Sequence, residues 1–220
     1  MSSLPSGRAQ KSVSLDELLD AAHQLLAQQT RRIMAIVGPP GAGKSTLAEK
    51  LRSELERSNP GAVAILPMDG FHYDDAILKQ NGRLPWKGAP DTFDVGGLCS
   101  VLSRLVDGGE AEVAVPVFDR ELEISRGSAR IIQADVRLIL LEGNYLLLNE
   151  APWSALGKFF GVTVMIDVAE RELERRLRER WLELHLPAQE AAFKIHDNDL
   201  PNGNRVRCNS AKADFVIADW

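Results

Sequence analysis

The sequence has 220 residues, of which 45% are hydrophobic and 26% are charged, a size and composition suited to one globular domain with a sizeable core. The formal net charge of −5 gives no overall attraction to nucleic acid or to an anionic membrane. No apolar run approaches the roughly 18 residues that a membrane span requires. The two cysteines, Cys99 and Cys208, lack metal-ligand spacing and exclude a disulfide framework. We therefore expect a cytoplasmic protein that binds neither nucleic acid nor a membrane.

The N-terminal region should contain a disordered tail over residues 1–13, because this stretch is rich in Ser, Gly, Lys and Arg. Ser14 and Glu17 then form a capping box, and an apolar stripe from Leu15 to Leu26 predicts a helix that packs on the outside of a sheet. A partner-binding role for this helix remains an alternative. Residues 14–220 are expected to form a single domain.

A phosphate-binding loop follows the short apolar run at 32–37, which is typical of a buried strand. The loop fits the pattern G-x-x-x-x-G-K-[ST], and apolar residues at helical spacing follow it. Glycines allow backbone N–H groups to surround phosphate oxygens, and the helix N-terminus adds a positive field. The lysine would reach the β- and γ-phosphates, and the serine hydroxyl would hold Mg²⁺. The predicted ATP-binding residues in this loop are Gly38, Gly41, Ala42, Gly43, Lys44, Ser45 and Thr46.

The remaining elements alternate between strands and helices. Strands are predicted at 62–66, 113–118, 136–141, 162–166 and 215–217, with Pro116 placing its strand at an edge. Helices are predicted at 95–106, 171–185 and 188–195, whereas 74–94 and 119–130 have no sustained period and are interpreted as irregular. The first of these irregular stretches would be an acceptor-binding insert. The pattern predicts a three-layer α/β P-loop NTPase fold with a mostly parallel sheet.

Two carboxylates come directly after predicted buried strands, at the edge where open parallel sheets bind ligands. We assign Asp69 to the acceptor hydroxyl and Glu142, with Ser45, to Mg²⁺ or its water. Spacing alone leaves this division of roles open, and a turn-forming role for either carboxylate is the alternative.

The predicted helix at 171–185 carries four arginines, of which Arg176 and Arg180 share one face and Arg175 and Arg178 share another. We expect it to be a lid that places one or two guanidinium groups over the γ-phosphate, although a solvated face paired with glutamates is equally compatible. The guanine motif of GTPases lacks its Asn or Thr at 211–214, and a kinase is therefore favoured. Candidate acceptor-binding residues are His72, Tyr73, Arg83, Lys87 and Arg120, with Trp86 near them.

The order of these motifs resembles the P-loop kinase family of uridine kinase, phosphoribulokinase and type I pantothenate kinase. It looks most like a bacterial branch of nucleoside/nucleotide kinase-like proteins labelled fructose transport system kinases. The resemblance implies that ATP is the donor, that Asp69 is the catalytic aspartate, and that Arg175 and Arg176 are lid arginines. It also implies that a loop at 198–202, with Asn202, borders the adenine. The segments that carry it are 38–46, 68–72, 87–94, 116–118, 141–143, 175–176 and 213–217.

The sequence thus predicts an ATP- and Mg²⁺-dependent kinase that phosphorylates a hydroxyl of a small metabolite, such as a sugar, a nucleoside or a pantothenate-like alcohol. One alternative is a nucleotide kinase with a phosphate acceptor, which would use arginines such as Arg83, Arg120 and Arg126. Another is an ATP-switched regulatory module whose N-terminal helix contacts a partner. The acceptor remains open, and a homo-oligomer is compatible with the sequence.

Overall fold

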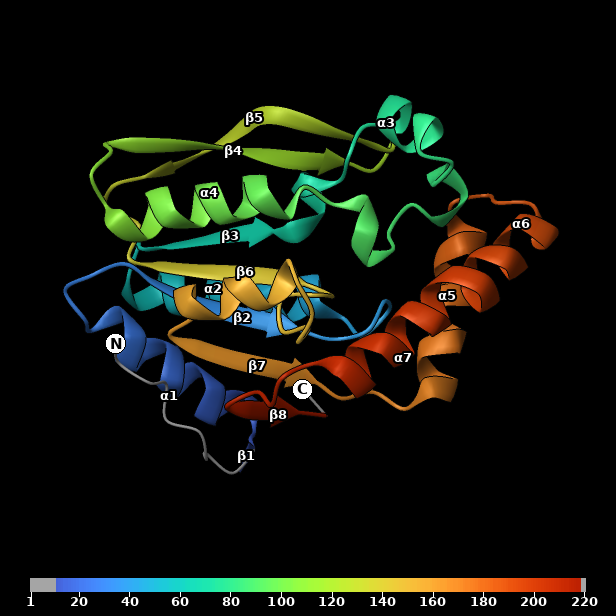
Figure 1. The fold of residues 1–220 in the computed structure, drawn as a ribbon. Coiled ribbons are helices and arrows are strands. Elements are labelled where there is room, and N and C mark those ends of the chain that lie inside the picture. Colours follow the sequence, from blue (N-terminus) through green and yellow to red (C-terminus); the bar gives the residue numbers. More distant parts are fainter. Residues whose placement is uncertain (1–10, 219–220) are drawn as a thin grey trace.

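The computed structural model describes residues 11–218, which form a parallel sheet with helices on both of its faces (Figure 1). The sheet has six strands in the order β1-β8-β7-β2-β6-β3, and every neighbouring pair is parallel. Sequential βα units therefore return each strand in the same direction, and all strand carboxyl ends meet at one edge. The strands are β1 (Lys11–Ser12), β2 (Arg32–Val37), β3 (Val63–Pro67), β6 (Leu138–Gly143), β7 (Val162–Ile166) and β8 (Phe215–Ile217).

The core lies in two layers, because alternate residues of the central strand point to opposite faces of the sheet. Ile33 and Ala35 of β2 pack with α4 (Val95–Asp107) and with a 3₁₀ segment, η4 (Trp153–Phe159). Met34 and Ile36 pack with α1 (Leu15–Leu26) and α2 (Lys44–Ser58) on the other face. These layers confirm the three-layer, mostly parallel α/β fold.

A two-stranded antiparallel hairpin, β4 (Glu112–Asp119) and β5 (Ile124–Gln133), lies beyond the β3 edge of the sheet (Figure 1). Its register shifts between Val115 and Val117, where Pro116 lacks the N–H that a ladder needs. The strand at 113–118 is thus confirmed but belongs to this separate hairpin. The irregular interpretation of 119–130 is wrong from Ile124 onward. Most of β5 is exposed, so it lacks the apolar alternation that would have revealed it.

Gly70 packs against Pro116 of this hairpin. It lies in the 3₁₀ segment η1 (Met68–Phe71), directly after β3. A Cβ at this position would lie 2.6 Å from the carbonyl oxygen of Pro116, which is backbone and cannot rotate away. We expect Gly70→Ala to lower the free energy of unfolding by about 1–3 kcal/mol, measured by urea denaturation. Gly109→Ala is the matched control, because nothing lies within 4 Å of its added Cβ. Equal stability of the two variants would contradict the close approach.

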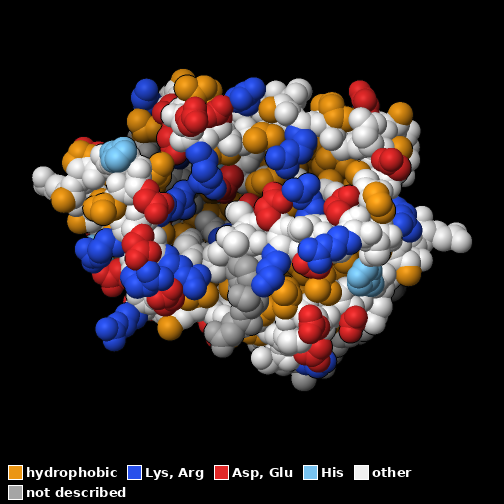
Figure 2. All heavy atoms as spheres, turned by 180° about the vertical axis from the view of Figure 1, so that it is seen from behind, with side chains coloured by type: hydrophobic (Ala, Val, Ile, Leu, Met, Phe, Trp, Pro, Cys, Tyr) orange, Lys and Arg blue, Asp and Glu red, His pale blue; other side chains and the backbone are white. Residues whose placement is uncertain are grey.

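The surface carries mixed charge. On the face seen from behind, Lys and Arg side chains lie among Asp and Glu side chains (Figure 2). Helix α2 contributes ion pairs at i,i+3 spacing, Arg52–Glu49 at 2.8 Å and Arg57–Glu54 at 2.6 Å. Such exposed pairs contribute little to stability, and they mark the solvated side of the helix. None of the helices between residues 11 and 218 combines the length and the apolar character needed to cross a bilayer.

The chain around α1 shows one correction to the predicted disordered tail. Residues 1–10 lie outside the described part of the chain, but Lys11 and Ser12 pair with Phe215 and Val216 of β8. Val13 is buried as well. The polar composition of the segment gave no sign of this edge pairing, which depends on backbone groups of β8. The capping box is confirmed: Glu17 N donates to Ser14 Oγ at 3.3 Å, and Ser14 N donates to Glu17 Oε2 at 3.0 Å.

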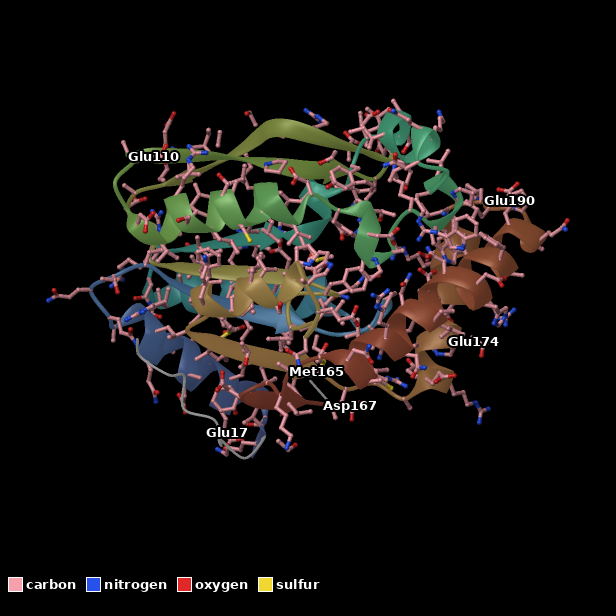
Figure 3. The ribbon with its side chains drawn as sticks, viewed as in Figure 1. Glu17, Glu110, Met165, Asp167, Glu174 and Glu190 are labelled. Carbon is pink, nitrogen blue, oxygen red and sulfur yellow. The ribbon has the colours of Figure 1, made fainter. Side chains whose placement is uncertain are left out.

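A helical segment at the carboxyl edge of the sheet lies beside the phosphate loop (Figure 3). Glu174 and Glu190 lie in it, at the opposite end of the molecule from Glu110, which lies between α4 and β4. The helix expected at 171–185 is confirmed. The loop expected at 198–202 is wrong, since it forms a π-helical turn and the start of a helix in which Pro201 occupies a tolerated first-turn position. The segment comprises α5 (Glu170–Glu183), α6 (Ala188–Phe193), the π-helical η5 (Lys194–Asp199) and α7 (Leu200–Asn209).

The stretch 74–94, interpreted as irregular, contains short helical pieces that its Gly and Pro content concealed. These are α3 (Asp75–Gln80), η2 (Leu84–Trp86) and η3 (Pro90–Thr92). Asp74 caps α3 by accepting a hydrogen bond from Ala76 N at 2.8 Å. Lys87, Gly88 and Phe93 of this stretch line the cleft described next.

Candidate active site

The phosphate loop between β2 and α2 has the backbone shape that an anion cradle needs. Gly41 and Gly43 have φ values of +81° and +90°, in the left-handed region that favours glycine. Helix α2 begins at Lys44, so its first N–H groups point toward the loop without helical partners. Backbone donors and the helix dipole therefore converge on one spot, which suits the phosphates of a nucleotide.

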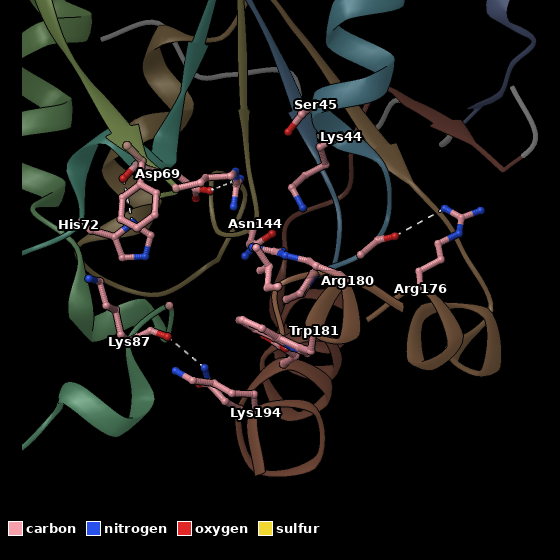
Figure 4. Close-up of a pocket in the computed structure, with 18 of the residues that line it drawn as sticks. Lys44, Ser45, Asp69, His72, Lys87, Asn144, Arg176, Arg180, Trp181 and Lys194 are labelled. Atoms are coloured by element: carbon pink, nitrogen blue, oxygen red, sulfur yellow. Dashed lines mark hydrogen bonds and ion pairs between the residues drawn. The ribbon is translucent and has the colours of Figure 1, made fainter. Parts of the chain in front are cut away.

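Lys44 is half-buried in this loop, and its Nζ donates to the carbonyl oxygen of Pro39 at 3.0 Å. Burial lowers the pKa of Lys44, and the nearby charges of Glu142 and Asp69 oppose that shift. The ammonium group is thus held inside the loop and points into the cleft (Figure 4).

Glu142 is the next-to-last residue of β6, in register with Pro67 of β3 and Ile36 of β2. It is only 5% exposed, and its Oε1 accepts a hydrogen bond from Ser45 Oγ at 3.0 Å. Burial is the main reason that the pKa of Glu142 is raised, and the charge of Asp69 adds to the effect.

Ser45 and Glu142 fit a magnesium ion that is bound chiefly through a nucleotide. Mg²⁺ takes six oxygen ligands, usually one or two from protein side chains and the others from phosphates and water. The hydroxyl and the carboxylate supply this protein share and already lie side by side. Among residues 11–218 no group of three or more His, Cys, Asp and Glu side chains could hold a metal. A cation here would therefore depend on phosphate oxygens.

Asp69 lies in η1, across the cleft from Lys44 (Figure 4). Its Oδ2 accepts from Arg120 Nη2 at 3.1 Å, and its carbonyl oxygen lies 2.8 Å from His72 Nδ1. The His72 ring lies between Phe93 and Phe118, with ring centroids 4.0 and 4.8 Å away. The aromatic pair and the His72 bond fix the backbone turn that presents the Asp69 carboxylate.

Burial lowers the pKa of His72 below the ordinary imidazole value of 6.5, so the folded protein holds this ring neutral. The unfolded chain binds a proton more readily. The His72 contribution to the free energy of unfolding is therefore complete above pH 6.5 and is lost as the pH falls from there toward the lowered value.

We expect His72→Gln to remove this part of the acid sensitivity. The stability difference between the wild type and the variant should shrink below pH 6.5, with a slope of at most about 1.4 kcal/mol per pH unit. Urea denaturation at several pH values measures it, with His23→Gln on the exposed side of α1 as the control. A difference that stays constant with pH would contradict a buried neutral ring.

The lid side of the cleft comes from α5 and η5, and Arg180, Trp181 and Lys194 point toward the space in front of Asp69 and Lys87 (Figure 4). Trp181 Nε1 donates to Asp199 Oδ2 at 2.8 Å, and burial raises the pKa of Asp199. The Arg180 guanidinium carbon lies 5.2 Å from the centre of the Trp181 ring. The lid therefore presents an aromatic surface with cations at its edges.

Two lid arginines differ in where their side chains go. Arg176 Nη1 lies 3.4 Å from the carbonyl oxygen of Ala42 in the phosphate loop, while its Nε donates to Glu172 at 2.8 Å. Arg175 donates to Glu172 and Glu179, and of the two only Arg176 is among the described side chains that line the cleft. The hydrogen bonds from Arg175 and Arg176 lower the pKa of Glu172 to about 2. The structure does not bring Arg175 into the cleft.

The cleft has a volume of about 560 Å³ and joins the phosphate loop, both strand-end carboxylates and the lid. Three candidate acceptor-binding residues, His72, Lys87 and Arg120, line it. Tyr73, Arg83 and Asn202 are not among the described residues that line it: Arg83 pairs with Asp91 at 2.6 Å, and Asn202 donates to Asn198 at 2.8 Å. Sequence reasoning missed the roles of Phe118, Glu123, Trp181, Lys194 and Asp199.

Trp181 illustrates why these roles were missed. It occurs at helical spacing with Leu173 and Leu177, a pattern that predicts a place on the apolar face of the helix. Its indole N–H instead bonds Asp199, which is 18 residues further along the chain. Tryptophan carries an N–H group that usually finds a hydrogen-bond partner when it is buried, and this could have indicated a polar role for Trp181. The partner, Asp199, can be identified only from the folded structure.

Two of the three relatives described here are named as small-molecule kinases. No protein-family model matches the chain. YggC of Escherichia coli is 35% identical over 90% of this chain and 81% of its own length. A Schizosaccharomyces pombe protein named "putative uridine kinase" is 32% identical over 93% of this chain and 90% of its own length. The pantothenate kinase of Myxococcus xanthus is 30% identical over 76% of this chain, which spans 53% of that enzyme.

Solved structures agree with these relatives. The structure from Silicibacter sp. TM1040 described as a "putative fructose transport system kinase" has a TM-score of 0.85 and 34% identity over 93% of this chain and 99% of its own. Phosphoribulokinase from Rhodobacter spheroides has a TM-score of 0.55 at 10% identity, with coverage of 81% of this chain and 68% of its own, and shares the fold alone.

Proposed function

The chain belongs to the P-loop kinase family of uridine kinase, phosphoribulokinase and type I pantothenate kinase, and we propose that Asp69 directs a small-molecule hydroxyl at the γ-phosphate of ATP held by residues 38–46. Membership makes the protein an ATP-dependent small-molecule kinase. The observation that supports this assignment of residues is one cleft that is lined by the phosphate loop, Asp69 and Glu142, with Lys44 of the loop across the cleft from Asp69.

In the proposed step the acceptor oxygen attacks the γ-phosphorus, and a new O–P bond forms as the bond to the β,γ-bridging oxygen breaks. The electron pair of that bond stays on the β-phosphate of ADP. Asp69 takes the hydroxyl proton, and Lys44 holds the β- and γ-phosphate oxygens in line. The apolar walls formed by Phe93 and Phe118 keep water from competing with the acceptor.

Ser45 and Glu142 would hold magnesium beside the phosphates. A bound Mg²⁺ would neutralise part of the negative charge of the triphosphate. The raised pKa of Glu142 fits this role, because a buried carboxylate in need of positive charge is a strong site for a cation. We place this activity in the cytoplasm, and the free thiols of Cys99 and Cys208 support that placement.

Arg176 and Arg180 are the lid residues that we propose to act on the transferring group, since both line the cleft. We expect Arg176→Ala and Arg180→Ala each to lower kcat by about 100-fold or more. Arg178→Ala is the matched control, because Arg178 is exposed and pairs with Glu174 at 2.8 Å on the same helix. Steady-state ADP release measures all three, and equal loss in the control would indicate a general defect of the lid helix.

An ADP-release screen tests the function as a whole. The panel contains sugars, nucleosides and pantothenate-like alcohols, and the expected result is strong stimulation by at least one of them. Stimulation only by nucleoside monophosphates would favour a nucleotide kinase. Slow hydrolysis that no acceptor stimulates, together with loss of a partner when residues 1–30 are removed, would favour an ATP-switched regulatory module.

A further inference from the structure

The Asp69 carboxylate, which is proposed to receive the acceptor hydroxyl, already accepts a hydrogen bond on one of its oxygens. Arg120 Nη2 donates to Asp69 Oδ2 at 3.1 Å, and this is the hydrogen bond that the described structure gives the Arg120 side chain. Arg120 follows β4 at the tip of the hairpin, and its side chain is 52% exposed. It is therefore accessible to a ligand that enters the cleft, whereas Asp69, at 29%, lies deeper.

The other cations near the acceptor space are held by groups that the proposed reaction does not use. Lys87 Nζ donates to Asp75 at 2.6 Å and to the carbonyl oxygen of Glu123. Lys194 lies over the Trp181 ring, with Nζ 6.0 Å from its centre. Arg120 differs from both, because its partner is the carboxylate on which the proposed chemistry depends.

A neutral alcohol that takes Oδ2 of Asp69 displaces the Arg120 guanidinium and leaves it without that counter-charge. An acceptor that also carries an anion can exchange partners: its anion pairs with Arg120, and its hydroxyl takes the released Oδ2. The exchange conserves the number of charge-assisted hydrogen bonds, so its cost is small. Glu123 and Glu183, which also line the cleft, repel an anion that does not reach Arg120.

We propose that Arg120 is a specificity-determining residue that selects acceptors with a carboxylate or a phosphate within a few ångströms of the reacting hydroxyl. The anion withdraws Arg120 from Asp69, and the acceptor hydroxyl then takes the Oδ2 atom that Arg120 held. The proposal rests on the proposed function, since it assumes that Asp69 receives the hydroxyl proton.

The test compares acceptors that differ only in the anion, with the full chain, ATP and Mg²⁺. Glycerate against glycerol and pantothenate against its alcohol examine carboxylates, and ribose 5-phosphate against ribose examines phosphates. Any further acceptor found in the screen is compared with its neutral or anionic counterpart. We expect kcat/KM to be at least about 10-fold higher for the anionic member. ³¹P NMR should show a new phosphomonoester.

Variants of Arg120 separate selection from a merely structural role. Arg120→Gln should lower kcat/KM for the anionic acceptor by about 10- to 100-fold and abolish its preference over the neutral counterpart. Arg120→Lys should retain part of the preference. Arg104→Gln on α4, which removes an exposed pair between Arg104 and Glu110, is the control and should change neither value.

Three outcomes would overturn the inference. Neutral acceptors that match their anionic counterparts would leave the kinase function intact and remove the role of Arg120, as would an equal loss for both acceptors in Arg120→Gln. A new phosphoric anhydride signal would show that the anion itself is the nucleophile. ATP binding without stimulation by any acceptor would instead contradict the proposed function.

Discussion

Replacement of Asp69 by Asn should lower kcat by about 100- to 10,000-fold, the range expected for loss of a general base. The amide keeps the size of the side chain and can still accept a hydrogen bond, but it cannot take the proton of the acceptor hydroxyl. The Kd for ATP should change little, because the phosphate loop lies across the cleft from Asp69. Single-turnover phosphoryl transfer and ATP titration of the same preparation measure the two quantities.

Asp167→Asn is the control for this variant. Asp167 also follows a buried strand, β7, but it is exposed and is not among the described residues that line the cleft. Its replacement should leave both kcat and ATP affinity near the wild-type values. If Asp69→Asn kept near-normal turnover with the acceptor identified by the screen, Asp69 could not be the base.

The sequence predicted the sheet well because its strands are buried on both sides. Strands β2 and β6 are continuous apolar runs with almost no exposed residue. Short runs of this kind are typical of strands in a parallel sheet that is covered on both faces. Strand β5 was not predicted because most of its residues are exposed and it therefore contains no continuous apolar run. The pairing of Lys11 and Ser12 with β8 also depends on backbone groups alone.

The site was predictable to the extent that it lies on strand ends. Asp69 and Glu142 were brought together by the rule that parallel strands present their carboxyl ends at one edge, and the β3–β6 register places them there. Contacts between distant segments were not predictable. The Arg120–Asp69 pair spans 51 residues, and the helical period could group Arg176 with Arg180 but could not show which lid face meets the phosphate loop.

Lys44→Met should lower kcat/KM for ATP by about 100- to 1,000-fold, since it removes the one cationic side chain of the phosphate loop at residues 38–46. Methionine has nearly the same length and no charge, so the loop keeps its packing. Lys50→Met, on the exposed side of the same helix, is the matched control and should retain wild-type values.

A thermal shift measurement distinguishes two ways in which Lys44 could act. ATP raises the Tm of the wild type because it binds the folded state, and the size of the increase reports affinity. A Lys44→Met protein that loses this increase has lost ground-state binding of the triphosphate. A protein that keeps the increase but loses turnover shows that Lys44 stabilises charge that develops only during transfer, which its position in the loop, near Glu142 and Asp69, also permits. Retention of both the Tm increase and the turnover would contradict any role for Lys44 in phosphate binding.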